Sequence, residues 1–527
     1  MRVLVLLLCL AFPVSAAPPT LTPLYPAGGQ QGKTAEITVS GTLDPWPIRA
    51  AANVKGIDLK PAKAKGTFAV AIAPDVPAGL YWVRLHNADG ASDQRPFFVG
   101  SLPEVLEVEP NDDPKKPQML SASSVVNGRL GALNDVDHFG IELKKGQTLV
   151  ASLQANSILR SPMDAVLQVL SPDGFVVAEN HDFNGLDPQI AFAVPSDGRY
   201  IVRLFAFPSV PNSSIRFFGS DLCIYRLTIT TGGFADYAFP LAVALKEPTA
   251  VELRGWNIPE SAKKIVLKPE HIADRFQVRH PEVANAVDIR IEPHPCIVEM
   301  EPNDRAQPQK IATPVTITGL IGRPREVDCY SFGLKKGERR TIRVEASSVG
   351  SALDPLVRII DEAGKSLNEA KTANIPSDPQ IVFAAPADGT YRVEVRDLYD
   401  HGGLRYFYRL RITAIEPTFN LAITADQFAL KAGESLEIPV TVTRLDGFAT
   451  PIVLRALDLP IGVESEPVKA EGPTKIVKLK LTATKGATSG AFRIEGAAGI
   501  TANARFVVPA AGTNTDSIWL TIRPSKK

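Results

Sequence analysis

The tetrapeptide Glu-Pro-Asn-Asp occurs twice in this chain, at Glu109–Asp112 and at Glu301–Asp304. Each copy begins a longer stretch that the other repeats about 191 residues away. The matching positions are Asp137 with Asp328, Lys144–Gly146 with Lys335–Gly337, Asp187–Ile190 with Asp378–Ile381, and Asp197–Tyr200 with Asp388–Tyr391. A register held over that length indicates that one domain has been duplicated within the chain.

Short runs of alternating polar and apolar residues dominate the sequence, and helical periodicity is hard to find. Val477–Thr482 is one such run, and Tyr200–Leu204 and Tyr391–Val395 are a matched pair in the two repeats. Turn residues (Gly, Pro, Asp and Asn) separate these runs at intervals of roughly 8–12 residues, which is typical of antiparallel sandwiches. The sequence therefore predicts an all-β chain of tandem β-sandwich domains, jelly-roll-like and immunoglobulin-like, with little helix.

Length and turn signals divide the chain into one leading segment and five domains. The leading segment has a basic start, an apolar run from Val3 to Phe12 and small residues before a Pro-rich stretch, which is typical of a cleavable secretory signal. The apolar run is shorter than the ~20 residues that span a bilayer. The predicted limits are 1–17 for the signal, 18–101 and 232–295 for two immunoglobulin-like modules, 102–231 and 296–415 for the repeats, and 416–527 for a last immunoglobulin-like domain.

Charge and cysteine content exclude some classes of protein. Acidic and basic residues balance to a formal net charge of zero, which argues against a nucleic-acid binder. Beyond the signal the chain keeps Cys223, Cys296 and Cys329, too few for a disulfide framework. Two interpretations stay open: a Cys296–Cys329 bridge, or small buried apolar residues. We expect a protein that is secreted, periplasmic or on the cell surface, with no membrane span.

Acidic residues flank each Glu-Pro-Asn-Asp with the same spacing. Alternate side chains of an extended segment share a face, so each Glu-x-Glu-x-Asn would present three oxygen donors together. Hard oxygen donors suit Ca²⁺, whereas Zn²⁺ prefers His and Cys. An acidic pair at the start of a nearby strand is the candidate to complete each shell. The predicted structural Ca²⁺ ligands are Glu107, Glu109, Asn111, Asp112, Asp135 and Asp137 in the first repeat, and Glu299, Glu301, Asn303, Asp304, Glu326 and Asp328 in the second.

The repeats resemble the bacterial pre-peptidase C-terminal (PPC) domain, a small β-sandwich found beside secreted proteases. Besides Glu-Pro-Asn-Asp, the motifs are Asp135–Phe139 with Glu326–Tyr330, Leu-Lys-Lys-Gly and Asp-Gly-x-Tyr, and they cover about half the chain. The resemblance implies Ca²⁺ at the positions given above; Glu326 departs from the pattern, because the first repeat has Asp135 there. Residues 18–101 resemble an immunoglobulin-like module of the IPT/TIG kind. The order of domains is similar to that of secreted planctomycete-type proteins.

An aromatic segment, Tyr399–Tyr408, offers either a ligand surface or core residues. As a surface it would present Tyr399, Tyr406 and Tyr408; as core, Tyr408 and its counterpart Tyr225 would pack inside the sandwiches.

The sequence shows neither a Gly-x-Ser-x-Gly elbow nor a His-Glu-x-x-His helix, so we expect no enzyme. The leading functional prediction is a non-catalytic protein that binds or spaces extracellular protein or polysaccharide partners. An accessory or targeting subunit of a secreted peptidase is the second, and a β-type hydrolase the third.

Overall fold

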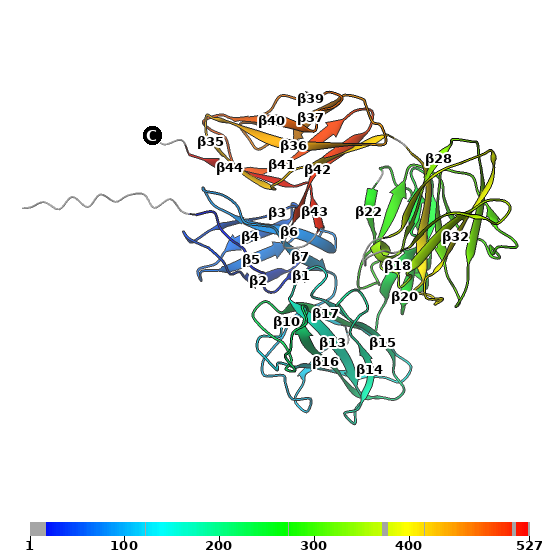
Figure 1. Cartoon of the computed structure of the whole chain (residues 1–527). Coiled ribbons are helices and arrows are strands. Elements are labelled where there is room, and N and C mark those ends of the chain that lie inside the picture. The colour runs from blue at the N-terminus through cyan, green and yellow to red at the C-terminus, as the bar shows by residue number, and fades with distance from the viewer. Residues whose placement is uncertain are drawn as a thin grey trace, which may run out of the picture.

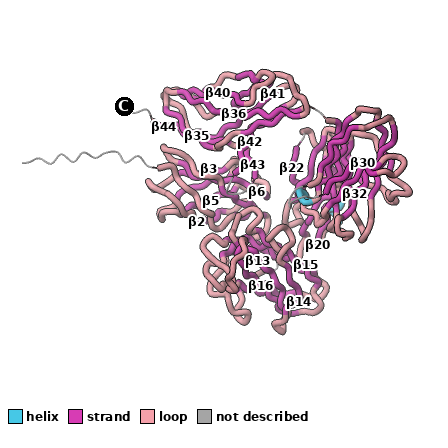
Figure 2. The backbone as a smooth tube through the Cα atoms, viewed as in Figure 1, coloured by secondary structure: helices cyan, strands magenta, loops and turns pink. Residues whose placement is uncertain are grey.

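A computed structural model describes residues 17–121, 123–271, 273–371, 378–415, 417–508 and 513–524. The predicted signal at 1–17 lies outside these residues except for Ala17. The described residues form β-strands and two single-turn 3₁₀ helices, η1 (Glu260–Lys263) and η2 (Ser347–Val349), so the all-β prediction is confirmed (Figures 1 and 2). None of the helices in the described residues has the length and apolarity to cross a membrane.

The two repeats fold into sandwiches of the same topology, here called sandwich 1 (102–231) and sandwich 2 (296–415). In sandwich 1 the sheets run β15-β12-β17-β10-β8 and β14-β13-β16-β11-β9, and in sandwich 2 they run β31-β28-β33-β26-β24 and β30-β29-β32-β27-β25. The strands of sandwich 1 are β8 (Glu104–Leu106), β9 (Gln118–Met119), β10 (Ser124–Arg129), β11 (Asp137–Leu143), β12 (Thr148–Gln154), β13 (Met163–Leu170), β14 (Val176–Asn180), β15 (Gln189–Ala193), β16 (Gly198–Pro208) and β17 (Ile224–Thr230). Those of sandwich 2 are β24 (Cys296–Val298), β25 (Gln309–Lys310), β26 (Val315–Leu320), β27 (Asp328–Leu334), β28 (Arg339–Glu345), β29 (Pro355–Ile360), β30 (Ser366–Lys371), β31 (Gln380–Ala384), β32 (Gly389–Asp397) and β33 (Phe407–Ala414).

Each sandwich is preceded by a smaller two-sheet module, here module 1 (18–101) and module 2 (232–295). Module 1 contains β1 (Gly28–Gln30), β2 (Thr34–Thr38), β3 (Arg49–Ala52), β4 (Ile57–Pro61), β5 (Thr67–Ile72), β6 (Gly79–His86) and β7 (Arg95–Gly100). Module 2 contains β18 (Phe234–Phe239), β19 (Ala242–Ala244), β20 (Thr249–Trp256), β21 (Ile265–Leu267), β22 (Ala273–Val278) and β23 (Val287–Glu292). In both modules a strand that follows a proline pairs in parallel with the last strand. After Pro26, β1 pairs with β7, and after Pro240, β19 pairs with β23.

The C-terminal domain (417–524) contributes a further core, and its strands form one connected set of sheets. Its strands are β34 (Thr418–Ala422), β35 (Gln427–Lys431), β36 (Ser435–Leu445), β37 (Ile452–Leu457), β38 (Val463–Glu464), β39 (Val468–Ala470), β40 (Ile476–Ala483), β41 (Gly490–Ala497), β42 (Thr501–Val508), β43 (Thr513–Thr515) and β44 (Ile518–Arg523). Alternation along β40 buries every second residue, as the sequence predicts.

Both modules dock on their sandwiches through the same strands. The Tyr25 hydroxyl donates to Asn127 O on β10 over 3.1 Å, and the Leu241 amide donates to Thr318 Oγ1, at the matching position of β26, over 2.9 Å. On the neighbouring strands, Ile224 belongs to the core of module 1, and Phe407 packs with Tyr237 of module 2. The structure thus repeats a module together with its sandwich, although the exact domain limits stay a prediction.

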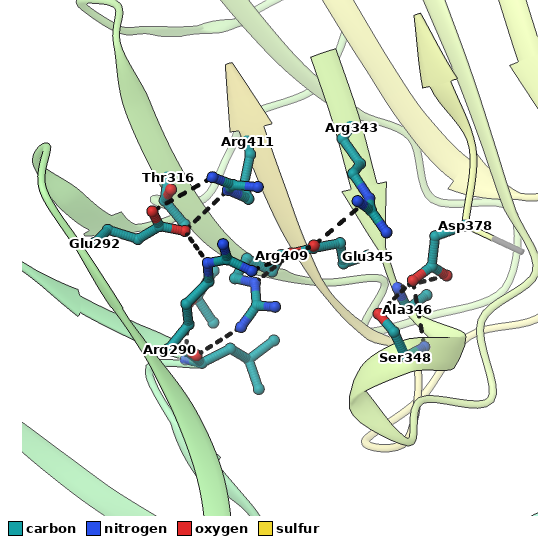
Figure 3. A network of polar contacts seen from close by, with 12 residues as sticks. Arg290, Glu292, Thr316, Arg343, Glu345, Ala346, Ser348, Asp378, Arg409 and Arg411 are labelled. Carbon is teal, nitrogen blue, oxygen red and sulfur yellow. Dashed lines mark hydrogen bonds and ion pairs between the residues drawn. The ribbon is translucent and has the colours of Figure 1, made fainter. Parts of the chain in front are cut away.

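A buried network of charges lies between module 2 and sandwich 2 (Figure 3). Glu292 on β23 is an ion-pair partner of Arg411, at 2.9 Å, and Arg409 pairs with Glu345 at 2.5 Å. Arg409 also donates to Leu241 O over 3.2 Å. At the corresponding place in sandwich 1, Arg226 binds both oxygens of Glu104, at 2.9 and 2.8 Å. Arginine therefore fastens the docking strand of both sandwiches.

The first and last described domains also contact each other. Arg84 on β6 pairs with Asp426 at 2.9 Å, and both side chains are buried. Module 1 contacts module 2 as well, because Arg279 donates to Ala78 O over 2.6 Å. Figure 1 shows the C-terminal domain above module 1, with sandwich 1 below it and sandwich 2 to one side.

The three cysteines beyond the predicted signal are free, so the Cys296–Cys329 bridge is not formed. Cys223 and Cys329 are buried, which agrees with the interpretation as small core residues.

Candidate metal centre

Three carboxylates meet at the same place in each sandwich. In sandwich 1 they belong to Glu107, Glu109 and Asp137, and one oxygen of each lies within 4.8 Å of the others. Glu299, Glu301 and Asp328 form the matching cluster in sandwich 2. These two sets are called carboxylate cluster 1 and carboxylate cluster 2 below.

Local structure explains why the clusters form. The Glu107 amide donates to Asn127 O over 3.0 Å and so extends the parallel pairing of β8 with β10; Glu299 does the same with Thr318 O over 3.0 Å. The next residue but one, Glu109 or Glu301, then lies on the same face of the extended segment. The buried Asp at the first position of β11 or β27 supplies the third carboxylate.

Each cluster has some oxygens that the protein satisfies and others that it does not. The backbone amide of Arg129 donates to Glu107 Oε2 over 2.5 Å, and that of Leu320 donates to Glu299 Oε1 over 2.7 Å. Three buried oxygens lack a hydrogen-bond partner among the described residues: Glu107 Oε1, Asp137 Oδ1 and Asp328 Oδ1. Buried polar atoms are almost always paired, so these oxygens are the ones that a bound cation could satisfy.

The electrostatics of the clusters support the same interpretation. Burial, with the neighbouring carboxylates, raises the pKa of Asp328 to about 9. Burial also raises the pKa of Glu107 and that of Glu299 to about 7. In cluster 1, burial and then Glu107 hold the pKa of Asp137 well above its usual range. A cation would remove this penalty, because it favours the ionised form of each carboxyl group.

The asparagine of each motif lies beside its cluster. The backbone N–H of Asn111 donates to Glu109 Oε2 over 3.0 Å, and the backbone N–H of Asn303 donates to Glu301 Oε2 over 3.2 Å. Both side chains are buried, and neither Oδ1 nor Nδ2 of Asn111 has a partner among the described residues. Three carboxylates and an amide oxygen form a donor set that suits Ca²⁺, which takes oxygen ligands.

Four of the predicted carboxylate ligands lie outside the clusters. Asp112 accepts the Val136 amide at 3.1 Å, and Asp135 accepts the Gly131 amide at 2.5 Å. In sandwich 2, Asp304 accepts the Ala306 and Gln307 amides at 2.8 and 2.9 Å, and Glu326 pairs with Arg323 at 3.0 Å. The structure therefore assigns these four carboxylates to turns, whereas Asp137 and Asp328 face the clusters.

Of the two interpretations of Tyr408, ligand surface or core, the structure agrees with the core. Tyr408 is fully buried, and its hydroxyl donates to Asp328 Oδ2 over 2.6 Å. Tyr225 makes the same bond to Asp137 Oδ2 over 2.5 Å. The matching positions of the two tyrosines in the repeats already favoured this placement in the core. Tyr330, which sequence reasoning missed, bonds Glu299 Oε2 at 3.2 Å, where sandwich 1 has Phe139.

The rest of the predicted aromatic surface is small. Tyr399 is 63% exposed, and Tyr406 is partly buried against the core of sandwich 2. Since Tyr408 packs inside, the three rings do not share one exposed face.

Comparison with known proteins agrees with this architecture. The family model described as "Bacterial pre-peptidase C-terminal domain" matches residues 135–206 and 326–397. A probable subtilase-type serine protease of Deinococcus radiodurans is 27% identical over 321 residues, which is 58% of this chain. The chain spans 39% of the length of that relative.

Two solved structures align with single parts of the chain. One is the pre-peptidase C-terminal domain of a collagenase from Bacillus anthracis, at 19% identity and a TM-score of 0.17, over 20% of this chain and 93% of that one. The other is PliG of Aeromonas hydrophila, a periplasmic inhibitor of g-type lysozyme, at 14% identity and a TM-score of 0.17, over 24% of this chain and 97% of that one.

Fold and repeats define the chain as a multidomain, all-β protein built from tandem β-sandwiches. Its two repeated sandwiches are bacterial pre-peptidase C-terminal domains.

Proposed function

We propose that this protein is an extracellular, non-catalytic scaffold that binds or spaces partner proteins or polysaccharides, with one structural Ca²⁺ in each PPC domain. The duplicated carboxylate cluster carries the proposal. Its buried oxygens, which have no hydrogen-bond partner in the described part of the chain, and the raised pKa values of Glu107, Glu299 and Asp328 support a cation there. Oxygen donors without His or Cys favour Ca²⁺ over Zn²⁺.

The metal would act on the joint between module and sandwich. When bound, Ca²⁺ supplies the positive charge that lets the carboxylates of each cluster ionise together. Glu107 and Glu109 belong to the segment that leaves module 1, whereas Asp137 begins a strand of the opposite sheet. Ligation would thus tie the entering segment to the sandwich, and in sandwich 2 Glu299, Glu301 and Asp328 would do the same.

A second candidate function is that of an accessory or targeting subunit for a secreted peptidase. The PPC family and the similarity to a probable subtilase-type protease favour it. A β-type hydrolase is the least supported alternative. Measurable turnover of casein or of a polysaccharide by the purified protein would refute the non-catalytic assignment.

Differential scanning calorimetry with Ca²⁺ and with EDTA tests the metal. Ligand that binds only the folded state raises stability by about 2.7 kcal/mol at a hundred times its Kd. We expect Ca²⁺ to raise the melting temperature of both PPC domains. Glu107→Gln should remove the shift from sandwich 1 alone, and Glu299→Gln from sandwich 2 alone. Identical melting in Ca²⁺ and EDTA would exclude the metal.

The partner is tested separately, by pull-down of soluble and polymeric extracellular material with the full chain. A retained polysaccharide or protein supports the binding role. Retention of a secreted peptidase in particular would favour the accessory subunit.

A further inference from the structure

Sandwich 1 has a surface pocket that neither carboxylate cluster accounts for. It has a volume of about 270 Å³ and is lined by residues that include Asp112, His138, Arg203, Phe205 and Phe217. His138 and Arg203 are partners in the pairing of β11 with β16, and Phe205 follows two residues along β16 on the same face. Phe217 comes from the segment 209–223 between β16 and β17. The ring centroids of Phe205 and Phe217 lie 4.4 Å apart.

The imidazole of His138 presents a hydrogen-bond acceptor. Its Nδ1 lies 3.1 Å from both Asn111 O and Val136 O, which can only accept, so the neutral ring carries its hydrogen on Nδ1. Nε2 is then an acceptor, and this atom is buried without a partner among the described residues. The whole side chain is 2% exposed. A buried acceptor of this kind calls for a donor from a ligand.

Charged groups of opposite sign flank this acceptor. Arg203 donates from Nε and Nη2 to Gln168 Oε1, which fixes the guanidinium and leaves Nη1 for a ligand acceptor. Arg203 has no ion-pair partner among the described residues. The Asp112 carboxylate, held by the Val136 amide at 3.1 Å, provides a second acceptor in the pocket lining.

Sandwich 2 fills the matching place with its own side chains. Cys329 and Glu394 stand where sandwich 1 has His138 and Arg203. Arg305 binds Glu394 through two hydrogen bonds, at 2.6 and 2.9 Å. The two repeats therefore differ in the charged groups at this place, and Arg203 of sandwich 1 is replaced by a paired Glu394 in sandwich 2.

We propose that this pocket binds the amino-terminal residue of a peptide when that residue is apolar. The ammonium group donates to Asp112 and to His138 Nε2, the first carbonyl accepts from Arg203 Nη1, and the side chain packs on Phe205 and Phe217. One residue offers all of these groups, and the pocket is smaller than the ~300–1,000 Å³ typical of drug-sized ligands. Capture of a chain terminus by convergent polar groups is a known recognition mode.

Exposed apolar residues on the segment 209–223 favour a peptide over a sugar. Val210 is 78% exposed and Ile215 is 94% exposed, on the segment that also carries Phe217. Aliphatic side chains suit the continuation of an apolar peptide, whereas sugar rings stack on flat aromatic faces.

Fluorescence polarisation with the full chain in Ca²⁺ tests the site. The probe is the peptide Phe-Gly-Ser-Gly labelled with fluorescein at its C-terminus, and its N-acetylated form is the matched control. We expect acetylation to weaken binding by about tenfold or more, as the loss of a charged hydrogen bond does. Asp112→Asn and Arg203→Gln should each weaken binding of the free-amine peptide by a similar factor. Asp112→Asn should leave the affinity for the acetylated peptide unchanged, because acetylation has already removed the ammonium group that would pair with Asp112.

Controls separate this site from the metal proposal. Arg203→Gln should keep the Ca²⁺-induced rise in melting temperature, which shows a folded protein, and Arg305→Ala in sandwich 2 should keep peptide binding. Equal affinity for the free and acetylated peptides would refute the proposal. Displacement of the probe by a tri-galacturonate that binds more tightly would assign the pocket to an acidic sugar instead.

Discussion

Tyr408 donates its phenolic hydrogen to Asp328 Oδ2 over 2.6 Å, while Oδ1 of the same carboxylate has no partner among the described residues. The hydroxyl thus holds one oxygen and leaves the other for the cluster. Groups that orient a metal ligand in this way typically contribute 10–100-fold in metal affinity. We expect Tyr408→Phe to weaken Ca²⁺ binding to sandwich 2 by about that factor, measured by isothermal titration calorimetry.

Tyr391→Phe is the matched control for this substitution. Tyr391 is also buried in sandwich 2, but its hydroxyl donates to Ala387 O over 2.7 Å, away from the cluster. Its loss should leave Ca²⁺ affinity unchanged. If both variants bind Ca²⁺ equally well, the tyrosine does not orient Asp328.

Substitutions of predicted ligands inside the clusters should reduce the stabilisation by Ca²⁺, whereas substitutions of those outside should not. Asp328→Asn removes a clustered carboxylate and should abolish the Ca²⁺-induced stabilisation of sandwich 2. In EDTA at pH 8 the same variant should be more stable than the natural protein, because the buried Asp328, with a folded pKa of about 9, must take up a proton on folding and Asn need not. Calorimetry in both buffers measures the two effects.

Glu326→Gln and Asp304→Asn are the controls, since both side chains bind turns. They should keep the Ca²⁺ response. Loss of the response in Glu326→Gln would show that this carboxylate turns toward the metal on binding.

The stability of the metal-free protein should fall as the pH rises. The folded pKa values of about 7 for Glu107 and Glu299 and about 9 for Asp328 lie above the ~4 of unfolded carboxyl groups. Groups shifted upward stabilise the fold fully below the unfolded pKa and lose that contribution as the pH passes the folded value. In EDTA we therefore expect the melting temperature to decline between pH 5 and pH 9.

Ca²⁺ should reverse this dependence, because it binds the ionised carboxylates. Melting curves across the pH range, with and without Ca²⁺, give the comparison. A melting temperature in EDTA that rises steadily from pH 5 to pH 9 would contradict the raised pKa values.

The C-terminal domain should detach from module 1 when its buried ion pair is broken. Asp426→Ala leaves Arg84 buried without its partner, which costs about 3–5 kcal/mol in comparable pairs. Small-angle X-ray scattering should then show a larger radius of gyration. Asp458→Asn, which breaks the exposed pair with Arg493 at 2.7 Å, should leave the radius unchanged.

The sequence carried enough information for the fold class, because alternation and turn residues are local signals. It also indicated the Glu-x-Glu face of each cluster, since Glu107 and Glu109 are two residues apart on one segment. It could not separate Asp135 from Asp137, because residues two apart share a face in an extended strand. The backbone of the preceding turn makes that choice, as the Gly131 amide binds Asp135.

The aromatic residues and the domain contacts show a second limit. Alternation groups Tyr406 with Tyr408 but does not say which face another sheet covers. Arg84 and Asp426 are 342 residues apart, and no local pattern links them. Such pairs become visible only when separate domains are placed against each other.

The contact between Arg84 and Asp426 has a consequence for how the chain withstands proteolysis. In an open string of domains, one cut in a connecting segment releases a fragment. Here the last domain is held to the first, and module 2 is held to module 1 through Arg279. A single nick would therefore leave both pieces associated, and a second break would be needed before either piece is lost.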